Sequence, residues 1–386
     1  MKKLAIVTSH PIQYNAPLFR LLTQRKRLQV KVFYSWGQTQ AGQVYDPDFK
    51  KSFSWDIPLL DGYEKEFIEN ISTNPGAGHF SGIKNKELIS RIKAFQPDAI
   101  LVYGWSFHSH LQVLRAFSGK VKLLFRGDSN LLDETQGFSA KKIVRRLFLR
   151  WVYSYVDVAV YTGRANKEYY LAHGLSEQQL KYAGHAVDNA RFAAEEQMHE
   201  QAAFRLRTEM GIGAQELVFL FAGKLEPKKD PATLIRAFSA IEQTDIRLII
   251  VGNGKLEQEL KQQAQNDQRI LFLDFQNQQQ MPVIYRLCNV FVLPSAGPGE
   301  TWGLSVNEAM ACSRAVLVSN KCGCAEDLVT AANGMVFEAG NVDDLKKAMH
   351  YFAENKKRTA QMGLAGSMRI KDFSQEAIAK AIEETI

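Results

Sequence analysis

The chain has 386 residues, enough for two domains that each bury their own hydrophobic core. Its hydrophobic fraction of 46% and charged fraction of 23% lie in the range of ordinary soluble proteins. The net charge of +7 favours anionic partners such as phosphates, nucleotides, acidic membrane surfaces or nucleic acid, although it also fits a soluble protein that is simply basic.

The apolar runs and the cysteines exclude further classes. The first run, Leu4–Val7, is too short for the core of a signal peptide, and no apolar run in the sequence has the length of a membrane span. We therefore expect a cytoplasmic protein. The cysteines lack the spacing of a zinc site or a disulfide framework, and we interpret them as small buried thiols near a ligand pocket. They are Cys288, Cys312, Cys322 and Cys324.

In the first half, short apolar runs alternate with amphipathic stretches, a pattern typical of a parallel α/β sheet. We predict strands at residues 4–8, 30–34, 99–103, 122–125 and 156–161. Helical patterns lie between several of them, at residues 17–24 and 86–95. Residues 36–82 are irregular and rich in Gly, Pro and aromatic residues, which predicts loops near a site.

Residues 141–156 predict a basic amphipathic helix. Its apolar stripe consists of Ile143, Val144, Leu147, Phe148, Trp151, Val152 and Tyr155. Its other face carries Lys141, Lys142, Arg145, Arg146 and Arg150. Such a helix could lie on an anionic membrane surface, which would suit a lipid-linked acceptor. The alternative, which we favour here, is a stripe packed on the core below a solvated basic face.

The second half restarts the α/β pattern. We predict strands at residues 217–221, 247–251, 270–273, 290–293 and 315–319. Helices fit at residues 231–241, 256–265, 281–288, 304–311 and 342–355.

The predicted fold class is therefore α/β, with two doubly wound, Rossmann-like domains that face a central cleft. We place an N-terminal, acceptor-binding domain at residues 1–195 and an interdomain linker at the polar stretch 196–215. A nucleotide-binding domain follows at residues 216–365, and a C-terminal helix at 366–386 is expected to pack back on the first domain. Functional residues should lie just after strands.

The segment that carries most information is Pro294–Ala311, where a Gly/Pro-rich loop leads from a strand into a helix that starts near Leu304. Unpaired N–H groups at such a helix start suit a phosphate. Glu300 and Glu308 flank this anion site and could hold hydroxyls of two different sugars. The alternative makes Glu300 a favourable helix N-terminal charge and Glu308 a solvated side chain.

Two further loops follow strands. The first holds Gly223, Lys224 and Lys229, a plausible diphosphate clamp, although a charged surface turn is the more common reading of such a loop alone. In the second, Gly252 and Gly254 allow a close approach of the backbone, which is weak evidence alone.

Together these segments resemble the retaining family-4 glycosyltransferases of the GT-B fold (glycosyl transferases group 1). The family's acidic signature is matched by Glu300 and by Glu308 with the following Ala-Met-Ala. Its donor loop is matched by Gly223-Lys224-Leu225 with Lys229, and its Gly-X-Gly by Gly252 and Gly254. Order and spacing agree over roughly residues 215–340.

The resemblance implies a role for each matched residue. Lys224 and Lys229 would contact the donor diphosphate, Glu308 the nucleotide ribose and Glu300 the transferred sugar. Backbone amides near Trp302, Gly303 and Leu304 would assist Glu300, and the backbone near Phe275, Gln276 and Asn277 would meet the base. It further implies a nucleotide diphosphate-sugar as substrate, neither a cofactor nor a metal, retention of anomeric configuration and no protein nucleophile.

The chain departs from the family pattern in three places. Ser313-Arg314-Ala315 stands where Gly-X-Pro is common, and the segment Thr8–Pro17 replaces a Gly-Gly loop and looks like a subgroup linked to surface-polysaccharide assembly. The family's active-site His is replaced by Arg126-Gly127-Asp128, so that Asp128 or Arg126 becomes the catalytic candidate.

Histidines supply the remaining acceptor-side candidates. His10 follows a strand and faces the predicted cleft, although a packing role before Pro11 is equally supported. We interpret His79, His108 and His110 as structural or exposed, and His185 as a residue that lines the cleft.

Three other functions compete with glycosyl transfer to a glycan, lipid-linked or small-molecule hydroxyl. A nucleotide-sugar epimerase would share the fold, but the acidic signature with the lysine loop argues against it. A sensor without turnover would share the donor site. The third is nucleic-acid binding, prompted by the positive charge. We expect no nucleic acid as a partner, because the sequence has no zinc pattern, single-strand platform or basic tail.

Overall fold

The computed structural model describes residues 1–36, 44–46, 51–134 and 139–386. The chain forms two compact units. Unit 1 comprises Met1–Val44, Ile57–His185 and Ser374–Ile386. Unit 2 comprises Tyr45–Asp56 and Ala186–Phe373.

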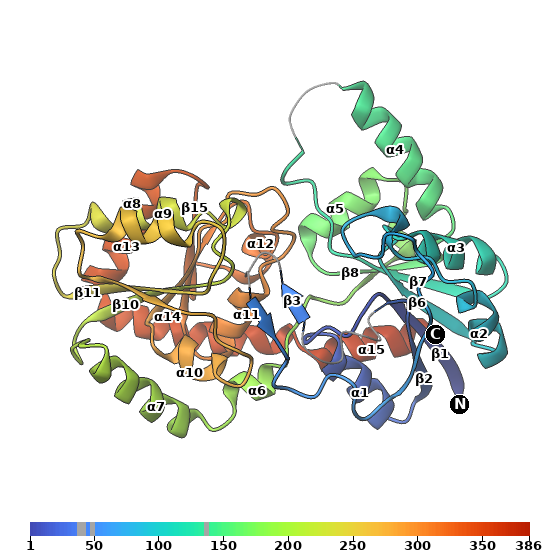
Figure 1. Ribbon diagram of the computed structural model, residues 1–386, viewed down its shortest axis with the longest axis horizontal. Coiled ribbons are helices and arrows are strands. Elements are labelled where there is room, and N and C mark those ends of the chain that lie inside the picture. The colour runs from blue at the N-terminus through green and yellow to red at the C-terminus, as the bar shows by residue number, and fades with distance from the viewer. Residues whose placement is uncertain (37–43, 47–50, 135–138) are drawn as a thin grey trace. The chain divides into compact units, whose positions relative to one another are not determined.

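Unit 1 is built on a seven-stranded sheet in the order β5-β2-β1-β6-β7-β8-β9, with every pairing parallel (Figure 1). The strands are β1 (Lys2–Thr8), β2 (Leu28–Tyr34), β5 (Glu64–Phe67), β6 (Ala99–Tyr103), β7 (Lys122–Arg126), β8 (Val158–Tyr161) and β9 (Leu180–Tyr182). The central strands β1 and β6 contain the continuous apolar, buried runs Leu4–Val7 and Ala99–Val102, as expected where helices cover both faces of a parallel sheet.

Unit 1 also contains helices. They are α1 (Ala16–Gln24), η2 (Phe80–Gly82), α2 (Leu88–Phe95), α3 (His108–Phe117), α4 (Ala140–Tyr153), α5 (Arg164–Ala172), η3 (Glu177–Gln179) and the C-terminal α15 (Gln375–Thr385). Although α15 is the last element of the chain, it packs beside α1 (Figure 1). Two short strands, β3 (Val44–Asp46) and β4 (Lys51–Phe53), form a separate two-stranded sheet.

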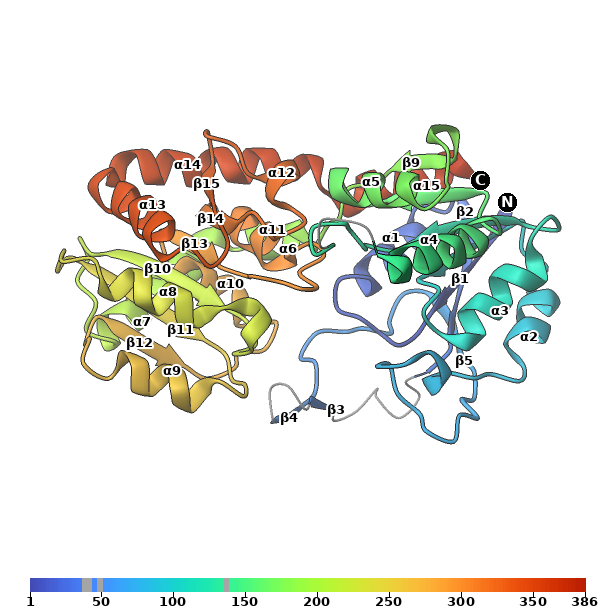
Figure 2. The same ribbon diagram turned by 90° about the horizontal axis from the view of Figure 1, so that it is seen from above.

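Unit 2 contains a six-stranded parallel sheet in the order β12-β11-β10-β13-β14-β15 (Figure 2). Its strands are β10 (Leu217–Ala222), β11 (Ile246–Val251), β12 (Ile270–Leu273), β13 (Val290–Leu293), β14 (Ala315–Ser319) and β15 (Gly334–Phe337). Alternate side chains of β10 enter different cores: Val218 and Leu220 pack in one, Phe219 and Phe221 in the other. Two layers of helices therefore sandwich this sheet.

The helices of unit 2 are mostly short. They are α6 (Asn189–Ala193), α7 (Glu196–Glu209), η4 (Pro227–Lys229), α8 (Pro231–Ser239), α9 (Glu257–Ala264), α10 (Met281–Arg286), α11 (Leu304–Ala311), α12 (Ala325–Leu328), α13 (Val342–Glu354), α14 (Lys356–Arg369) and η5 (Ile370–Asp372). In the part of the chain that the structure describes, no helix combines the length and apolarity needed to cross a bilayer.

The α/β fold class is confirmed, and every strand and helix predicted from apolar periodicity is present, with its ends shifted by up to three residues. The C-terminal helix expected at residues 366–386 is shorter and begins at Gln375, because residues 366–369 end α14. The segment expected as a linker, 196–215, instead contains α7, a polar helix of strong helix formers with only Ala203 fully buried. The main segment of unit 2 begins at Ala186, directly after His185 of unit 1. Part of the expected loop region 36–82 lies outside the described residues.

Candidate functional site

In unit 2 the loops after β10, β11, β12 and β13 meet at one edge of the sheet. These four strands are consecutive neighbours and all parallel, so that their carboxyl ends point the same way. Open α/β sheets bind ligands at this edge. The predicted donor residues all lie in these loops or in α11.

A charged cluster joins two of the loops. The ammonium group of Lys229, in η4, donates a hydrogen bond to Oε2 of Glu300, and Ser295 Oγ donates to the same oxygen at 2.8 Å. The backbone N–H of Ala296 donates to the carbonyl of Lys228 at 2.9 Å. The Glu300 side chain is only 8% exposed, and that of Lys229 19%. The loops after β10 and β13 therefore place an ammonium and a carboxylate side by side.

Gly303 carries the chain from this cluster into α11. It is the N-cap residue, and its φ of 101° is one that L side chains rarely adopt. A Cβ atom there would lie 2.7 Å from Leu293 Cδ2 and 3.8 Å from Glu300 Oε1. The helix N-terminus, which carries the positive end of the helix dipole, is thus held against the strand end next to Glu300, where an anion would be favoured.

The glycines after β11 allow the closest approach of two backbones in this region. A Cβ atom on Gly252 would lie 2.1 Å from the carbonyl oxygen of Gly223, and one on Gly254 would lie 2.5 Å from that of Leu225. Between them, Asn253 accepts a hydrogen bond from Phe275 N at 2.8 Å. This residue, which sequence reasoning missed, joins the loops after β11 and β12.

Glu308 lies one helical turn after Leu304 on α11, where its side chain is half-buried. Tyr285 Oη donates to its Oε2 at 2.6 Å, and Arg191 contributes a nearby positive charge. Burial raises the pKa of the Glu308 carboxyl above its ordinary value, and the Tyr285 hydrogen bond opposes this rise. Glu308 is therefore a half-buried side chain that accepts a hydrogen bond within unit 2, and it is not fully solvated. Tyr285 was not predicted, because nothing in the sequence pairs it with a residue 23 positions away.

The other donor candidates differ in burial and in the hydrogen bonds that their side chains make. The Trp302 indole is buried and donates to Asn307 Oδ1 at 2.8 Å, so only its backbone remains for a ligand, whereas Leu304, the first residue of α11, is half-buried. Gln276 Nε2 donates to the Asp274 carbonyl at 3.0 Å. Asn277 Nδ2 donates to the Ser54 carbonyl at 2.7 Å, in the Tyr45–Asp56 segment of unit 2. Lys224 is half-buried directly after Gly223.

Unit 1 has a pocket of about 180 Å³ at the carboxyl ends of its own strands. Two of the predicted catalytic residues, Arg126 and Asp128, line it. His185 lines it too, with its ring 5.5 Å from that of Tyr14, and burial followed by the charge of Arg126 lowers the pKa of His185 to about 3. The imidazole is therefore neutral at physiological pH.

The remaining histidines have structural partners. His10 is half-buried; its Nδ1 lies 2.9 Å from Ser9 Oγ, and its ring meets that of Trp36 edge-on. His110 is buried between Ser35 Oγ, 2.9 Å from its Nε2, and the carbonyl of Tyr103, 3.0 Å from its Nδ1. The structural interpretation of His110 is thus confirmed.

His79 and His108 lie near the surface of unit 1. His79 is exposed, with Nδ1 3.1 Å from Ser81 Oγ, and the His108 ring packs edge-on against Phe80. Within the described ranges, no group of three or more His, Cys, Asp or Glu side chains could hold a metal ion. All the cysteines are buried and free, as interpreted, and Cys324 Sγ would lie 3.5 Å from a Cβ atom on Gly303.

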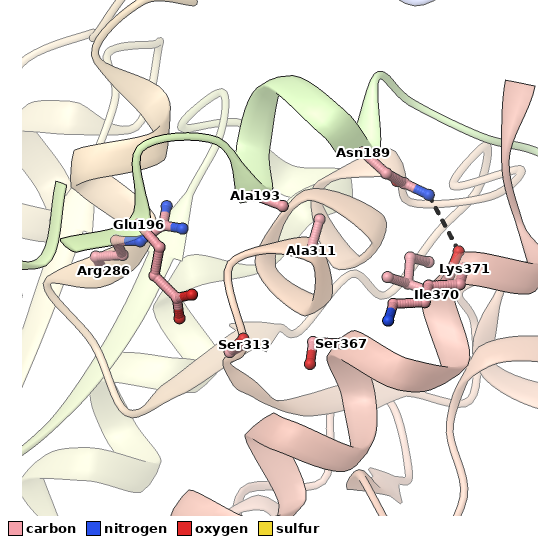
Figure 3. Close-up of a pocket in the computed structure, with 9 residues that line it drawn as sticks. All are labelled: Asn189, Ala193, Glu196, Arg286, Ala311, Ser313, Ser367, Ile370 and Lys371. Atoms are coloured by element: carbon pink, nitrogen blue, oxygen red, sulfur yellow. Dashed lines mark hydrogen bonds between the residues drawn. The ribbon is translucent and has the colours of Figure 1, made fainter. Parts of the chain in front are cut away.

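A second cavity of about 180 Å³ in unit 2 lies among helices, away from the sheet edge (Figure 3). Asn189, whose Nδ2 donates to the Ile370 carbonyl at 3.0 Å, closes one side, and Arg286 lies on the other. The donor candidates belong to other parts of unit 2, so we do not assign this cavity to the donor.

The structure contradicts the favoured alternative for the basic helix. In α4 the buried side chains are Leu149, Val152 and Tyr153, spaced to form one stripe on the core. The predicted apolar stripe is instead largely exposed: Ile143 by 43%, Val144 by 67%, Leu147 by 63%, Phe148 by 40% and Trp151 by 41%. Figure 1 shows the N-terminal half of α4 standing clear of the sheet of unit 1.

Comparisons with known proteins agree with this geometry. Residues 204–368 match the family model of glycosyl transferases group 1. The GDP-mannose-dependent monoacylated alpha-(1-6)-phosphatidylinositol monomannoside mannosyltransferase of Corynebacterium glutamicum is 27% identical over 246 residues, 61% of this chain and 64% of that protein. A D-inositol 3-phosphate glycosyltransferase of Nocardia farcinica is 26% identical over 46% of this chain and 42% of its own. The chain thus matches less than two thirds of the length of these relatives.

Solved structures match the whole chain. Anabaena HepE in complex with UDP has a TM-score of 0.72 and 18% identity, with 100% of this chain and 99% of that one covered. Sucrose-phosphate synthase of Thermosynechococcus elongatus has a TM-score of 0.72 at 17% identity, covering 100% and 98%. The predicted GT-B fold, with two Rossmann-like domains, is thereby confirmed.

Proposed function

We propose that this chain transfers a sugar from a nucleotide diphosphate-sugar to an acceptor hydroxyl with retention of configuration. Its residues 204–368 match the family model of glycosyl transferases group 1. One observation carries the proposal: Lys229 and Glu300 are paired at the carboxyl edge of the unit 2 sheet, beside the N-terminus of α11. Anabaena HepE structures are complexes with UDP, with UDP and glucose, and with UDP-glucose, which supports a ligand of this class.

The donor diphosphate would lie between cations and amide donors. Lys229 and Lys224 supply positive charge, and the first N–H groups of α11 supply hydrogen bonds. Glu300 would accept hydroxyls of the transferred sugar, and Glu308 would accept those of the ribose. A metal is not needed in this scheme, because the lysines and helix amides offset the diphosphate charge.

In the proposed step, the acceptor oxygen bonds to the anomeric carbon as the bond from that carbon to the diphosphate oxygen breaks. The acceptor proton passes to the departing phosphate oxygen, on the same face of the sugar. Negative charge therefore grows on the diphosphate, and groups positioned to meet it before the reaction lower the barrier most. No protein nucleophile is required.

We expect donor affinity to fall on acidification at a higher pH than an ordinary glutamate would cause. The ionised Glu308 accepts ribose hydroxyls, and burial raises its pKa, so that protonation and the loss of acceptors begin above the ordinary value of about 4.3. Calorimetric titrations with an intact nucleotide diphosphate-sugar between about pH 8 and pH 5 would measure this. Glu308→Gln should bind the donor weakly at every pH and show no loss of affinity on acidification. Identical pH profiles for the wild type and the variant would contradict the role of Glu308 in binding the ribose.

We further propose that unit 1 docks on an anionic membrane at the cytoplasmic face, which suits a lipid-linked acceptor. The exposed apolar stripe of α4 would enter the interface between headgroups and acyl chains. Its basic residues would contact the headgroups, and the helix contains no acidic residue.

Vesicle sedimentation tests the docking. We expect binding to vesicles with anionic lipid and little binding to neutral vesicles. The double variant Lys141→Gln/Arg145→Gln should bind about 30-fold more weakly, since each cation near the surface contributes about 1 kcal/mol. Val144→Gln/Leu147→Gln should also bind weakly because it removes exposed apolar area.

The matched control for the charge variant is Lys347→Gln/Lys357→Gln, which removes the same charge from exposed positions of unit 2. This control should bind like the wild type. If it weakens binding as much as the α4 variant, only net charge matters and the docking surface is misplaced.

A further inference from the structure

The pocket of unit 1 contains a buried cation that its own fold satisfies only in part. Arg126, at the end of β7, is 4% exposed. Its Nη1 donates to the carbonyl of Ala183 at 3.0 Å and, less directly, to that of Val160 at 3.4 Å. Its Nη2 is buried and has no hydrogen-bond partner among the described residues. A desolvated guanidinium that lacks a partner is costly, which points to a ligand.

Two hydroxyl groups that line the same pocket are also buried without a hydrogen-bond partner among the residues that the structure describes. Tyr103 Oη and Thr162 Oγ1 are both buried without a partner in the described part of the chain. Each can donate a hydrogen bond, as can the guanidinium. The pocket therefore gathers donors and one fixed positive charge in about 180 Å³, which is the setting that an oxyanion needs.

Asp128 sets a second requirement on the ligand. Its carboxylate lines the pocket and interacts electrostatically with Arg126. An ionised carboxylate only accepts hydrogen bonds, and it repels a second anion placed against it. A ligand that contacts both residues favourably presents its oxyanion to Arg126 and a hydroxyl to Asp128, as an acidic sugar does.

We propose that this pocket selects an acceptor that carries an oxyanion on a sugar, either the carboxylate of a uronic acid or the phosphate of a sugar phosphate. Arg126 Nη2, Tyr103 Oη and Thr162 Oγ1 hold the oxyanion, and Asp128 accepts a ring hydroxyl. The pocket is smaller than the roughly 300–1,000 Å³ of sites for drug-sized ligands, so it takes one sugar residue, not a nucleotide-sugar. This inference rests on the proposed glycosyl transfer and names its acceptor class.

Calorimetry on the full chain tests the acceptor class with glucuronate, glucose 6-phosphate and glucose, each at the same ionic strength. We expect glucuronate or glucose 6-phosphate to bind at least tenfold more tightly than glucose, and the better of the two identifies the oxyanion. Equal affinity for all three, or no binding of either acid, would overturn the inference.

Two Tyr→Phe variants test whether the acidic sugar binds in this pocket. Tyr103→Phe removes only one hydroxyl, so the fold should persist while the affinity for the better acid falls about tenfold. Tyr182→Phe, at an exposed position of the same unit, should leave it unchanged. Unchanged affinity in Tyr103→Phe would place the acid elsewhere.

A parallel titration with nucleoside diphosphates separates this inference from the proposed function. Binding of a nucleoside diphosphate without binding of an acid would overturn the acceptor class alone. Failure of both would overturn the proposed function as well.

Discussion

Lys229→Ala should lower kcat for sugar transfer by about 10²- to 10³-fold, the effect expected when one preorganised group that stabilises developing charge is removed. Its ammonium group lies against Glu300 at the sheet edge, and both side chains are mostly buried. In the proposed step the departing diphosphate gains negative charge next to this ammonium. The interaction therefore strengthens toward the transition state, and kcat should fall more than KM rises.

The neighbouring lysine provides the control. Lys228 lies in the same short helix, pairs with Glu226 at 3.3 Å and is 41% exposed. Lys228→Ala removes the same charge from a more solvent-exposed position and should change kcat by less than about threefold. Steady-state measurement of nucleoside diphosphate release would compare the variants. Equal losses in both would show that Lys229 acts only through the net charge of the loop.

Gly252→Ala should have the largest effect on stability. At φ of 132° an L side chain is strained, and the new Cβ atom would lie 2.1 Å from the carbonyl oxygen of Gly223. That atom belongs to backbone that follows a central strand, so one of the two loops must move. We expect a loss of about 3 kcal/mol or more in the free energy of unfolding, or roughly 6–12 °C in Tm. Because the loops also carry the donor residues, affinity for the donor should fall too.

Gly340→Ala separates the two causes of this loss. Gly340 also has a positive φ, of 76°, but nothing lies within 4 Å of a Cβ atom built on it. It should lose about 1–2 kcal/mol from backbone strain alone and keep donor affinity. Thermal unfolding of both variants, monitored by circular dichroism, would measure the difference. A Tm loss in Gly252→Ala no larger than in Gly340→Ala would mean that the two backbones are not in close contact.

The fold could be predicted largely because parallel strands buried on both faces are short apolar runs. The stretch that forms α7 was misread, because a polar helix on the surface lacks the apolar periodicity that marks the others. The exposure of Leu147 in α4 could not be predicted either. Periodicity shows which residues share a face, but only the packed structure shows which face meets the core.

The donor site could be predicted where its residues follow strands in sequence, as Glu300 and Lys229 do. The residues that hold these two side chains and their loops in place could not be predicted. Ser295 and Asn253 are common loop residues, and their role depends on which strands are neighbours in the sheet. Likewise, the unpartnered nitrogen of Arg126 follows from the positions of distant carbonyls, which no local pattern encodes.

The central claim, that the sheet edge of unit 2 binds a nucleotide diphosphate-sugar for transfer, is tested most directly by titrating the purified chain with UDP, GDP and ADP and their sugar conjugates. We predict that one nucleoside diphosphate binds without added metal and raises Tm, and that its sugar conjugate is turned over when an acceptor is supplied. Binding without turnover across the acidic and neutral acceptors would leave a nucleotide-sugar sensor. No binding of any of the nucleotides would contradict the assignment of the donor site.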